Sequence, residues 1–194
     1  MAHITALPAT LATPERASFI RSQLLPVALG TLFLAAGSWI AVPMLPIDVN
    51  MQTYAVIVVG ALFGARMGVL TVMAWLAEAA LGLPVLSHGA AGLHHFFGPS
   101  AGYIVSFPVI AAFTGWLADR KLDTGILRSL TSMLAANAIN LALGVLWLAT
   151  FLGWHNAILG GFMPFWIGGL LKAAMATATI AVARKQNWKL FPRA

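Results

Sequence analysis

One lysine, Lys172, lies in the middle of an apolar segment, whereas the other Lys and Arg residues lie in polar breaks between such segments. A charged side chain at the centre of a membrane helix costs about 2.5 to 3.5 kcal/mol, so a buried lysine usually has a function and a partner. Either the ammonium binds an anionic ligand, or it extends toward a membrane interface. Because apolar stretches separate Lys172 from both ends of its segment, we expect it to bind a ligand.

Polar and aromatic residues three or four positions apart share a helix face and could complete a pocket around the lysine. Phe165 and Gly169 share the Lys172 face, two asparagines align in the preceding apolar segment, and Glu78 is the only carboxylate well inside an apolar segment. Simpler roles stay open: the asparagines could link helices, Glu78 could pair with Lys172 or cap a loop, and Tyr103 could belong to an interfacial aromatic belt. The candidate substrate-binding residues are Lys172, Glu78, Tyr103, Asn137, Asn140, Phe165 and Trp166.

The composition indicates the class of protein that must position these side chains. With 60% hydrophobic and 8% charged residues in 194, the chain is too apolar for a soluble domain. We therefore expect a multi-pass protein of the lipid bilayer, in the cell (inner) membrane. The net charge of +6 fits basic residues beside an anionic leaflet, so we expect no nucleic-acid partner. The absence of cysteine excludes disulfides and thiolate chemistry, and we expect no cofactor.

The apolar stretches predict an all-α fold of six transmembrane helices. A crossing needs about 20 residues, and the stretch 51–63 is short, so charge decides the count. If 51–63 is a separate crossing, Arg66 and all the other basic clusters fall on the same side of the membrane. Because cytoplasmic loops carry an excess of Lys and Arg, that side is the cytoplasm. We expect an N-terminal tail at 1–23, a membrane domain at 24–185 and a C-terminal tail at 186–194, both tails cytoplasmic. The expected spans are 24–45, 51–63, 69–83, 101–117, 130–152 and 162–183.

Two outer loops are rich in Pro, Gly and aromatic residues, at 42–50 and 83–102. Irregular backbone at membrane depth is tolerated only where protein covers it or where it lines a cavity. The second loop therefore suggests a lid over a binding site, although it could be a simple connector. The candidate lid residues are His95, Phe97, Gly98, Pro99 and Ser100.

The sequence motifs that could indicate catalysis or metal binding give little support for either. The run GPSAG at 98–102 matches G-x-S-x-G, but that motif needs a strand-turn-helix setting in a sheet that we do not expect. Ser100 with His94 or His95 would make an intramembrane serine hydrolase, which we keep as a remote alternative. The outer histidines lack a carboxylate cluster, so we expect no metal site. No phosphate-binding G-x-x-x-x-G-K-[ST] run occurs, so any ATPase must be another chain.

Four motifs in order give the chain a close resemblance to the BioY family. They are VPMLPIDVNMQT at 42–53, LGLPVL at 81–86, GPSAGYIVSF at 98–107 and PFWIGGLLK at 164–172. The resemblance implies the biotin-binding S component of an energy-coupling factor (ECF) transporter, working with a transmembrane coupling subunit and two ATPase subunits. It implies a biotin-binding role for Lys172, on the carboxylate or the ureido oxygen, and adds Gln52 and Thr53 as pocket candidates.

The chain departs from the family pattern at positions that matter for binding. The family's Asp three residues before the lysine is Gly169 here, and Asp48 and Asn50 replace a Pro and a Thr. We expect Glu78 to supply the missing carboxylate.

Partner docking and coupling are less well defined by the sequence. The resemblance implies that small residues of the first helix meet the coupling subunit, and the nearest matches are Thr31 with Ala35 and Gly37 with Ala41. A solitary secondary carrier for biotin or another small anion stays the alternative, although no inverted repeat of the kind common in such carriers is evident.

Overall fold

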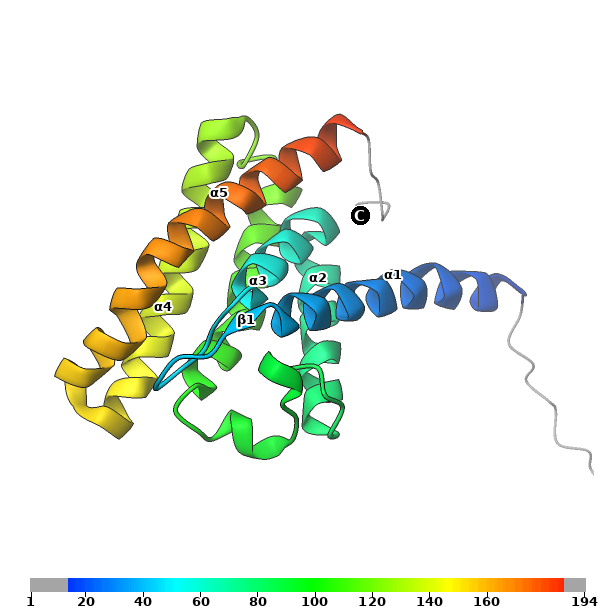
Figure 1. Cartoon of the computed structure of the whole chain (residues 1–194). Helices are drawn as coiled ribbons and strands as arrows, with labels where there is room; N and C mark the ends of the chain where they lie inside the picture. The colour runs from blue at the N-terminus through cyan, green and yellow to red at the C-terminus, as the bar shows by residue number, and fades with distance from the viewer. Residues whose placement is uncertain (1–13, 187–194) are drawn as a thin grey trace, which may run out of the picture.

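The computed structural model describes residues 14–186, with side chains from residue 23 onward. Most of the two expected tails, including Lys189 and Arg193, therefore lies outside the described residues. The described chain is mostly helical (Figure 1). Its elements are α1 (Pro14–Trp39), β1 (Ala41–Val42), β2 (Val49–Asn50), α2 (Gln52–Ala80), the 3-10 helices η1 (Ser87–Gly89) and η2 (Leu93–Phe96), α3 (Ala101–Asp119), α4 (Ile126–Ala157), the π-helix η3 (Ile158–Phe162) and α5 (Met163–Lys185). Because α1 begins at Pro14, part of the segment expected as a tail is helical.

Three continuous helical stretches of the described chain are long and apolar enough to cross a membrane: Gln52–Ala80, Ala101–Asp119 and Ile126–Lys185. The apolar part of α1, Gln23–Trp39, is shorter. The first and third stretches each contain two of the spans expected from the sequence. The six-span arrangement therefore stays a prediction that depends on where these stretches bend.

Both long stretches bend at a glycine in a left-handed conformation. In α2 the break is at Gly64, with φ of 81°, and in α4 it is at Gly153, with φ of 74°. Glycine adopts positive φ without the steric cost that other residues meet. The α2 break coincides with the polar interruption that the sequence placed between spans 51–63 and 69–83. A carboxylate from α3 caps the restarted helix, since Asp119 Oδ2 accepts a hydrogen bond from the Ala65 amide at 2.9 Å.

The two halves of α2 approach closely at glycines. A Cβ on Gly68 would lie 2.9 Å from the Cα of Gly60, so a larger residue would force the halves apart. This is the close packing between helices that small residues at a spacing of four allow. α2 is also the central element, with α1, α3 and α5 packed against it. Trp75 of α2 is fully buried, and the centroid of its ring lies 5.7 Å from the centroid of the Phe107 ring on α3.

The segment 41–50 forms a small antiparallel hairpin, which the all-helical expectation omits. Ala41 of β1 pairs with Asn50 of β2, and the Met51 amide donates to the Ile40 carbonyl at 3.0 Å. Prolines 43 and 46 lie between the strands and disfavour a helix there. Figure 1 shows this hairpin extending from the end of α1 toward the turn between α4 and α5.

Three tryptophan indoles from different helices fix the second outer loop. Trp39 of α1 donates to the Pro84 carbonyl, Trp75 of α2 donates to the Val85 carbonyl, and Trp147 of α4 donates to the Gly98 carbonyl, each at 3.0 Å. The backbone amide of Gly92 adds a bond of 2.7 Å to the Ala79 carbonyl of α2. The loop is therefore tied to the helices at its start, middle and end.

An ion pair joins the α3–α4 turn to the end of α5. The Arg184 guanidinium lies 2.6 Å from Asp123 Oδ2 and also donates to the Asp123 carbonyl at 3.0 Å. The Asp123 side chain is 0% exposed. Breaking such a buried pair leaves an uncompensated charge, so this contact holds the two elements together.

Candidate ligand-binding site

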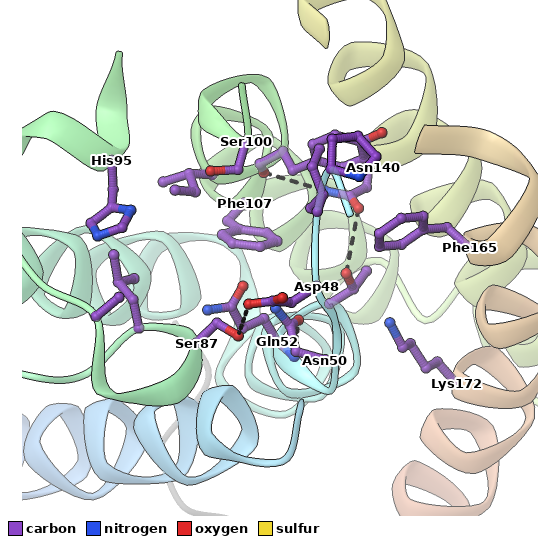
Figure 2. Close-up of a pocket in the computed structure, with 17 residues that line it drawn as sticks. Asp48, Asn50, Gln52, Ser87, His95, Ser100, Phe107, Asn140, Phe165 and Lys172 are labelled. Atoms are coloured by element: carbon purple, nitrogen blue, oxygen red, sulfur yellow. Dashed lines mark hydrogen bonds between the residues drawn. The ribbon is translucent and has the colours of Figure 1, made fainter. Parts of the chain in front are cut away.

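A cavity of about 240 Å³ lies among the hairpin, the loop 81–100 and helices α2 to α5 (Figure 2). The sequence singled out eight of its lining residues: Gln52, Thr53, His95, Ser100, Tyr103, Asn140, Phe165 and Lys172. Phe107, on the same helix face as Tyr103, was also expected there. The sequence did not assign to the pocket the rest of the lining: Pro46, Ile47, Asp48, Asn50, Leu86, Ser87, Ala90 and Ile104. Most of the missed residues belong to the two outer loops, whose paths a helical periodicity does not predict.

Lys172 projects from α5 into this cavity, beneath Phe165, as Figure 2 shows. Lys172 is only 6% exposed, yet its ammonium forms no hydrogen bond or ion pair with any residue in the described range. The pairing with Glu78 that the sequence left open is therefore not made. An enclosed ammonium without a protein partner favours a binding role over extension toward an interface.

A polar network joins α2, α3 and α4 at the cavity wall. The Thr53 hydroxyl donates to Asn140 Oδ1 at 3.4 Å, and Asn140 Nδ2 donates to the Tyr103 carbonyl at 3.3 Å and to the Ser106 hydroxyl. Asn140 thus links helices and also lines the cavity. Because these groups hold one another, the wall presents polar atoms in a fixed arrangement.

Tyr103 is buried inside the protein and does not belong to an interfacial belt. Its hydroxyl donates to the Gly161 carbonyl of η3 at 2.8 Å. Its ring stacks on Phe165 of α5, with centroids 5.7 Å apart and planes inclined by 27°. Tyr103 and Phe165 therefore form an aromatic wall beside the Lys172 ammonium, on the α5 side of the cavity.

The carboxylate at the cavity belongs to Asp48 of the hairpin. Its Oδ2 accepts a hydrogen bond from the Ser87 hydroxyl at 3.1 Å and lies 3.5 Å from His88 Nε2. Its Oδ1 accepts a bond of 3.3 Å from the Met44 amide. Glu78, which the sequence proposed as the carboxylate of the site, does not line the cavity. One feature of the sequence could have indicated Asp48 as a site residue: it is the only charged residue in the loop 42–50.

Several other candidates lie away from the cavity. Asn137 and Trp166 line a separate apolar groove of about 580 Å³ among α4, η3 and α5. The Asn137 amide donates along its own helix to the Met133 carbonyl at 3.1 Å. In the second loop, Phe97 is 72% exposed, and neither Gly98 nor Pro99 lines the cavity. The Gly98 carbonyl instead accepts the hydrogen bond of the Trp147 indole that fixes the end of the loop.

Ser100 forms no catalytic pair with His94 or His95 in the described chain. Ser100 and His95 both line the cavity, but no hydrogen bond joins them. Burial lowers the pKa of His95 below its usual 6.5, and the neighbouring His94 lowers it further. Over residues 23–186, whose side chains the structure describes, no group of three His, Asp or Glu side chains is suited to hold a metal ion.

The docking residues proposed from the sequence do not form one outward face of α1. Thr31 and Gly37 are buried, and a Cβ on Gly37 would lie 2.9 Å from the Cβ of Ala55 on α2. Ala35 is half-buried, and Ala41 lies in β1, beyond the end of the helix. Thr31 and Gly37 therefore point into the protein, and docking of the coupling subunit at these four residues stays a prediction.

Comparisons with known proteins agree on one family. Residues 10–189 match the BioY family. A probable biotin transporter BioY of Pyrococcus horikoshii is 34% identical, over 83% of this chain and 94% of that relative. The biotin transporter BioY of Rhizobium etli is 33% identical, over 79% of this chain and 86% of its own.

A solved structure shares the fold. It is the crystal structure of the S-component for biotin from an ECF-type ABC transporter, with a TM-score of 0.76 and 24% identity over 87% of this chain and 93% of that one. The three long apolar stretches and the names of the relatives as transporters indicate a membrane protein. On the family match and the identity to these relatives, this chain belongs to the BioY family.

Proposed function

We propose that this chain is the substrate-binding membrane subunit of a biotin uptake system, capturing biotin from the outer side. The observation that carries the proposal is the enclosed Lys172 ammonium, which lines a cavity and lacks a protein partner among the described residues. The names of the relatives support biotin as the ligand. The cavity of about 240 Å³ suits a vitamin better than a drug-sized ligand, whose pockets span roughly 300 to 1,000 Å³.

The chemistry of the lining matches that of biotin, which has a carboxylate on an apolar chain and a fused ring with a ureido group. Lys172 supplies a cation for the carboxylate or the ureido oxygen, and Gln52 and Asn140 supply amides. Tyr103 and Phe165 supply apolar surface for the ring or chain. A few placed polar groups in an apolar and aromatic pocket are typical of small-molecule sites.

We propose six membrane crossings with both termini in the cytoplasm and the chain in the inner or cell membrane. The breaks at Gly64 and Gly153 support this count, because each divides a long helical stretch near an expected boundary. The basic residues near α3, α4 and the end of α5 then share the cytoplasmic side. The hairpin and the loop 81–100 cover the cavity from outside.

Transport inward requires partners in this proposal, namely a coupling transmembrane subunit and two ATPases. The solved structure with the same fold comes from an ECF-type ABC transporter, and this sequence has no phosphate-binding loop motif. The BioY family is one of transporters, so the serine hydrolase alternative loses its support. A solitary carrier is the second candidate for the mode of transport.

The test is uptake of radiolabelled biotin by a biotin-requiring host that lacks its own biotin transporter. Expression with coupling and ATPase subunits should restore uptake, and the Lys172→Ala variant should not. Uptake with this chain alone would favour the solitary carrier. The proposed function is wrong if neither arrangement restores uptake although the chain reaches the membrane.

A further inference from the structure

His95 of η2 is a second side chain of the cavity that has no protein partner. It lines the cavity and is half-buried. Its imidazole forms no hydrogen bond or ion pair with any residue in the described range, although its backbone amide donates to the Gly92 carbonyl at 3.4 Å. A neutral imidazole carries one hydrogen-bond donor and one acceptor. His95 therefore offers both groups to a solute in the cavity.

His95 and Lys172 lie on opposite sides of the cavity, as Figure 2 shows. Lys172 belongs to α5, whereas His95 belongs to a loop that is held on both sides of it. Before His95, the Gly92 amide donates to α2 at 2.7 Å, and after it the Gly98 carbonyl accepts the Trp147 indole at 3.0 Å. The cavity therefore has a positioned polar group at each end, which suits an elongated ligand with polar groups at both ends.

The aromatic wall decides which end of biotin each group would meet. Tyr103 and Phe165 stack on one another beside the Lys172 ammonium. The fused ring is the bulkiest part of biotin, and it gains most from contact with these rings. Its ureido oxygen then lies by the ammonium, and the chain extends to the other end of the cavity. We propose that His95 binds the carboxylate of biotin there and makes the site select a ligand with an acid at that end.

The partial exposure of His95 fits this assignment, which rests on the proposed function for the identity of the ligand. A carboxylate loses less hydration at a half-buried position than at an enclosed one, so its transfer from water costs less there. The imidazole N–H can donate to it in a hydrogen bond to a charged acceptor, which is stronger than one between neutral groups. Lys172 remains the partner of the uncharged ureido oxygen.

Few charged groups surround His95. The other titratable side chains that line the cavity or contact the His95 ring are His94, Asp48, Tyr103 and Lys172, with His88 beside Asp48. Asp48 would repel a second carboxylate, but its oxygens already accept hydrogen bonds from the Ser87 hydroxyl at 3.1 Å and the Met44 amide at 3.3 Å. A ligand carboxylate therefore has His95, and not the Asp48 side of the cavity, as its favourable partner.

The assignment gives biotin binding a pH dependence with a definite sign. Burial, and then His94, lower the pKa of His95 below its usual 6.5, so the free protein holds a neutral imidazole at pH 7. A bound carboxylate favours the imidazolium and raises this pKa. Because binding and protonation then favour each other, the affinity for biotin should rise as the pH falls below 7.5. The ligand carboxyl, with an ordinary pKa of about 4.3, stays mostly ionised down to pH 5.5.

Equilibrium titration with biotin and with its primary amide, which lacks the charged carboxylate, tests the contact. At pH 7.5, His95→Ala should weaken biotin binding about three- to tenfold, the range of one lost hydrogen bond, and should leave binding of the amide within twofold. Lys172→Ala should weaken binding of both ligands, because the ureido group is common to them. His155→Ala, at an exposed histidine that does not line the cavity, is the matched control and should bind both normally.

The same titrations at pH 5.5 test the charge. Wild-type affinity for biotin should rise about two- to fivefold, the range of a half-exposed ion pair, and affinity for the amide should not. His95→Gln keeps an N–H donor without a titratable group, so it should bind biotin better than His95→Ala does and lose the gain at pH 5.5.

Three results overturn the proposal while leaving the proposed function intact. They are normal biotin binding by His95→Ala, equal losses of biotin and of the amide in that variant, and a gain at pH 5.5 that persists in His95→Gln. A folded wild-type chain that binds no biotin overturns the proposed function, and the role of His95 with it.

Discussion

Lys172 on α5 and Asp48 on the hairpin line the same cavity without forming an ion pair. Asp48 is instead held by Ser87 and His88, whereas the Lys172 ammonium has no partner in the described part of the chain. Two opposite charges that share an enclosed space usually neutralise each other. Their separation leaves the ammonium without a protein partner among the described residues and the carboxylate bound to the η1 turn.

Removal of the ammonium should weaken biotin binding. Truncating one partner of a buried charge-assisted bond costs about 2 to 5 kcal/mol, so Lys172→Ala should weaken biotin binding by that amount in equilibrium titration. Lys185→Ala, at an exposed position of the same helix, is the control and should bind normally. Binding by Lys172→Ala within twofold of wild type would mean that the lysine is not part of the site.

The aromatic wall should be sensitive to one added methyl group. A Cβ on Gly144 would overlap the ring of Tyr103, so Gly144→Ala should displace the phenol from Gly161 and Phe165. Such overpacking costs about 1 to 3 kcal/mol and outweighs the gain in helix propensity. The expected result is weaker biotin binding and a lower thermal midpoint in detergent.

The matched control for this substitution is Gly168→Ala. A Cβ there meets only Val49 Cγ1, at an ordinary 3.9 Å. Gly168→Ala should therefore retain binding and stability. Equal behaviour of the two alanine variants would show that Tyr103 does not need its observed position.

The buried pair between the α3–α4 turn and the end of α5 should contribute to stability and not to binding specificity. Arg184→Ala leaves Asp123 buried without its cation, which typically costs about 3 to 5 kcal/mol. Thermal unfolding should show a clear loss for Arg184→Ala, none for Lys185→Ala, and partial recovery in the Arg184→Ala, Asp123→Ala double variant. A double variant as unstable as the sum of the single ones would exclude coupling between the two residues.

His95 should be mainly neutral at pH 7. Burial, and then the charge of His94, lower its pKa below 6.5, so folding favours the neutral imidazole. The stability from this group is present above pH 6.5 and is lost as the pH falls through the lower folded value. An NMR titration of the imidazole should give a value below 6.5 that rises in His94→Ala. A value at or above 6.5 in the native protein would contradict this account.

The sequence predicted the site on the helices better than the site on the loops. Lys172 and Phe165 share a face of α5 at helical spacing, so periodicity placed these two side by side. Tyr103 and Asn140 were candidates because they are polar residues in apolar segments, and the packing of α3 and α4 against α5 brings them to the same cavity. The sequence also predicted the break in α2, because Gly64 and Gly68 flank the polar Arg66 there. For Asp48 no periodic signal exists, because its position depends on the hairpin and on a contact with a distant turn.

Two predicted residues lie away from their expected surroundings for a common physical reason. Glu78 was predicted as a pocket residue because it is a carboxylate inside an apolar segment. Gly37 was predicted as a docking residue because the family resemblance implies small, spaced residues on the first helix. Composition and spacing give the relative positions of residues on one helix. They do not give the rotation of that helix against its neighbours, which packing decides.

The most direct test of the central claim is isothermal titration of biotin into the purified, detergent-solubilised chain, beside Lys172→Ala. The account predicts saturable binding at one site per chain in the wild type and binding weakened by about 2 to 5 kcal/mol in the variant. No binding by a folded wild-type chain, or equal binding by both proteins, would contradict it.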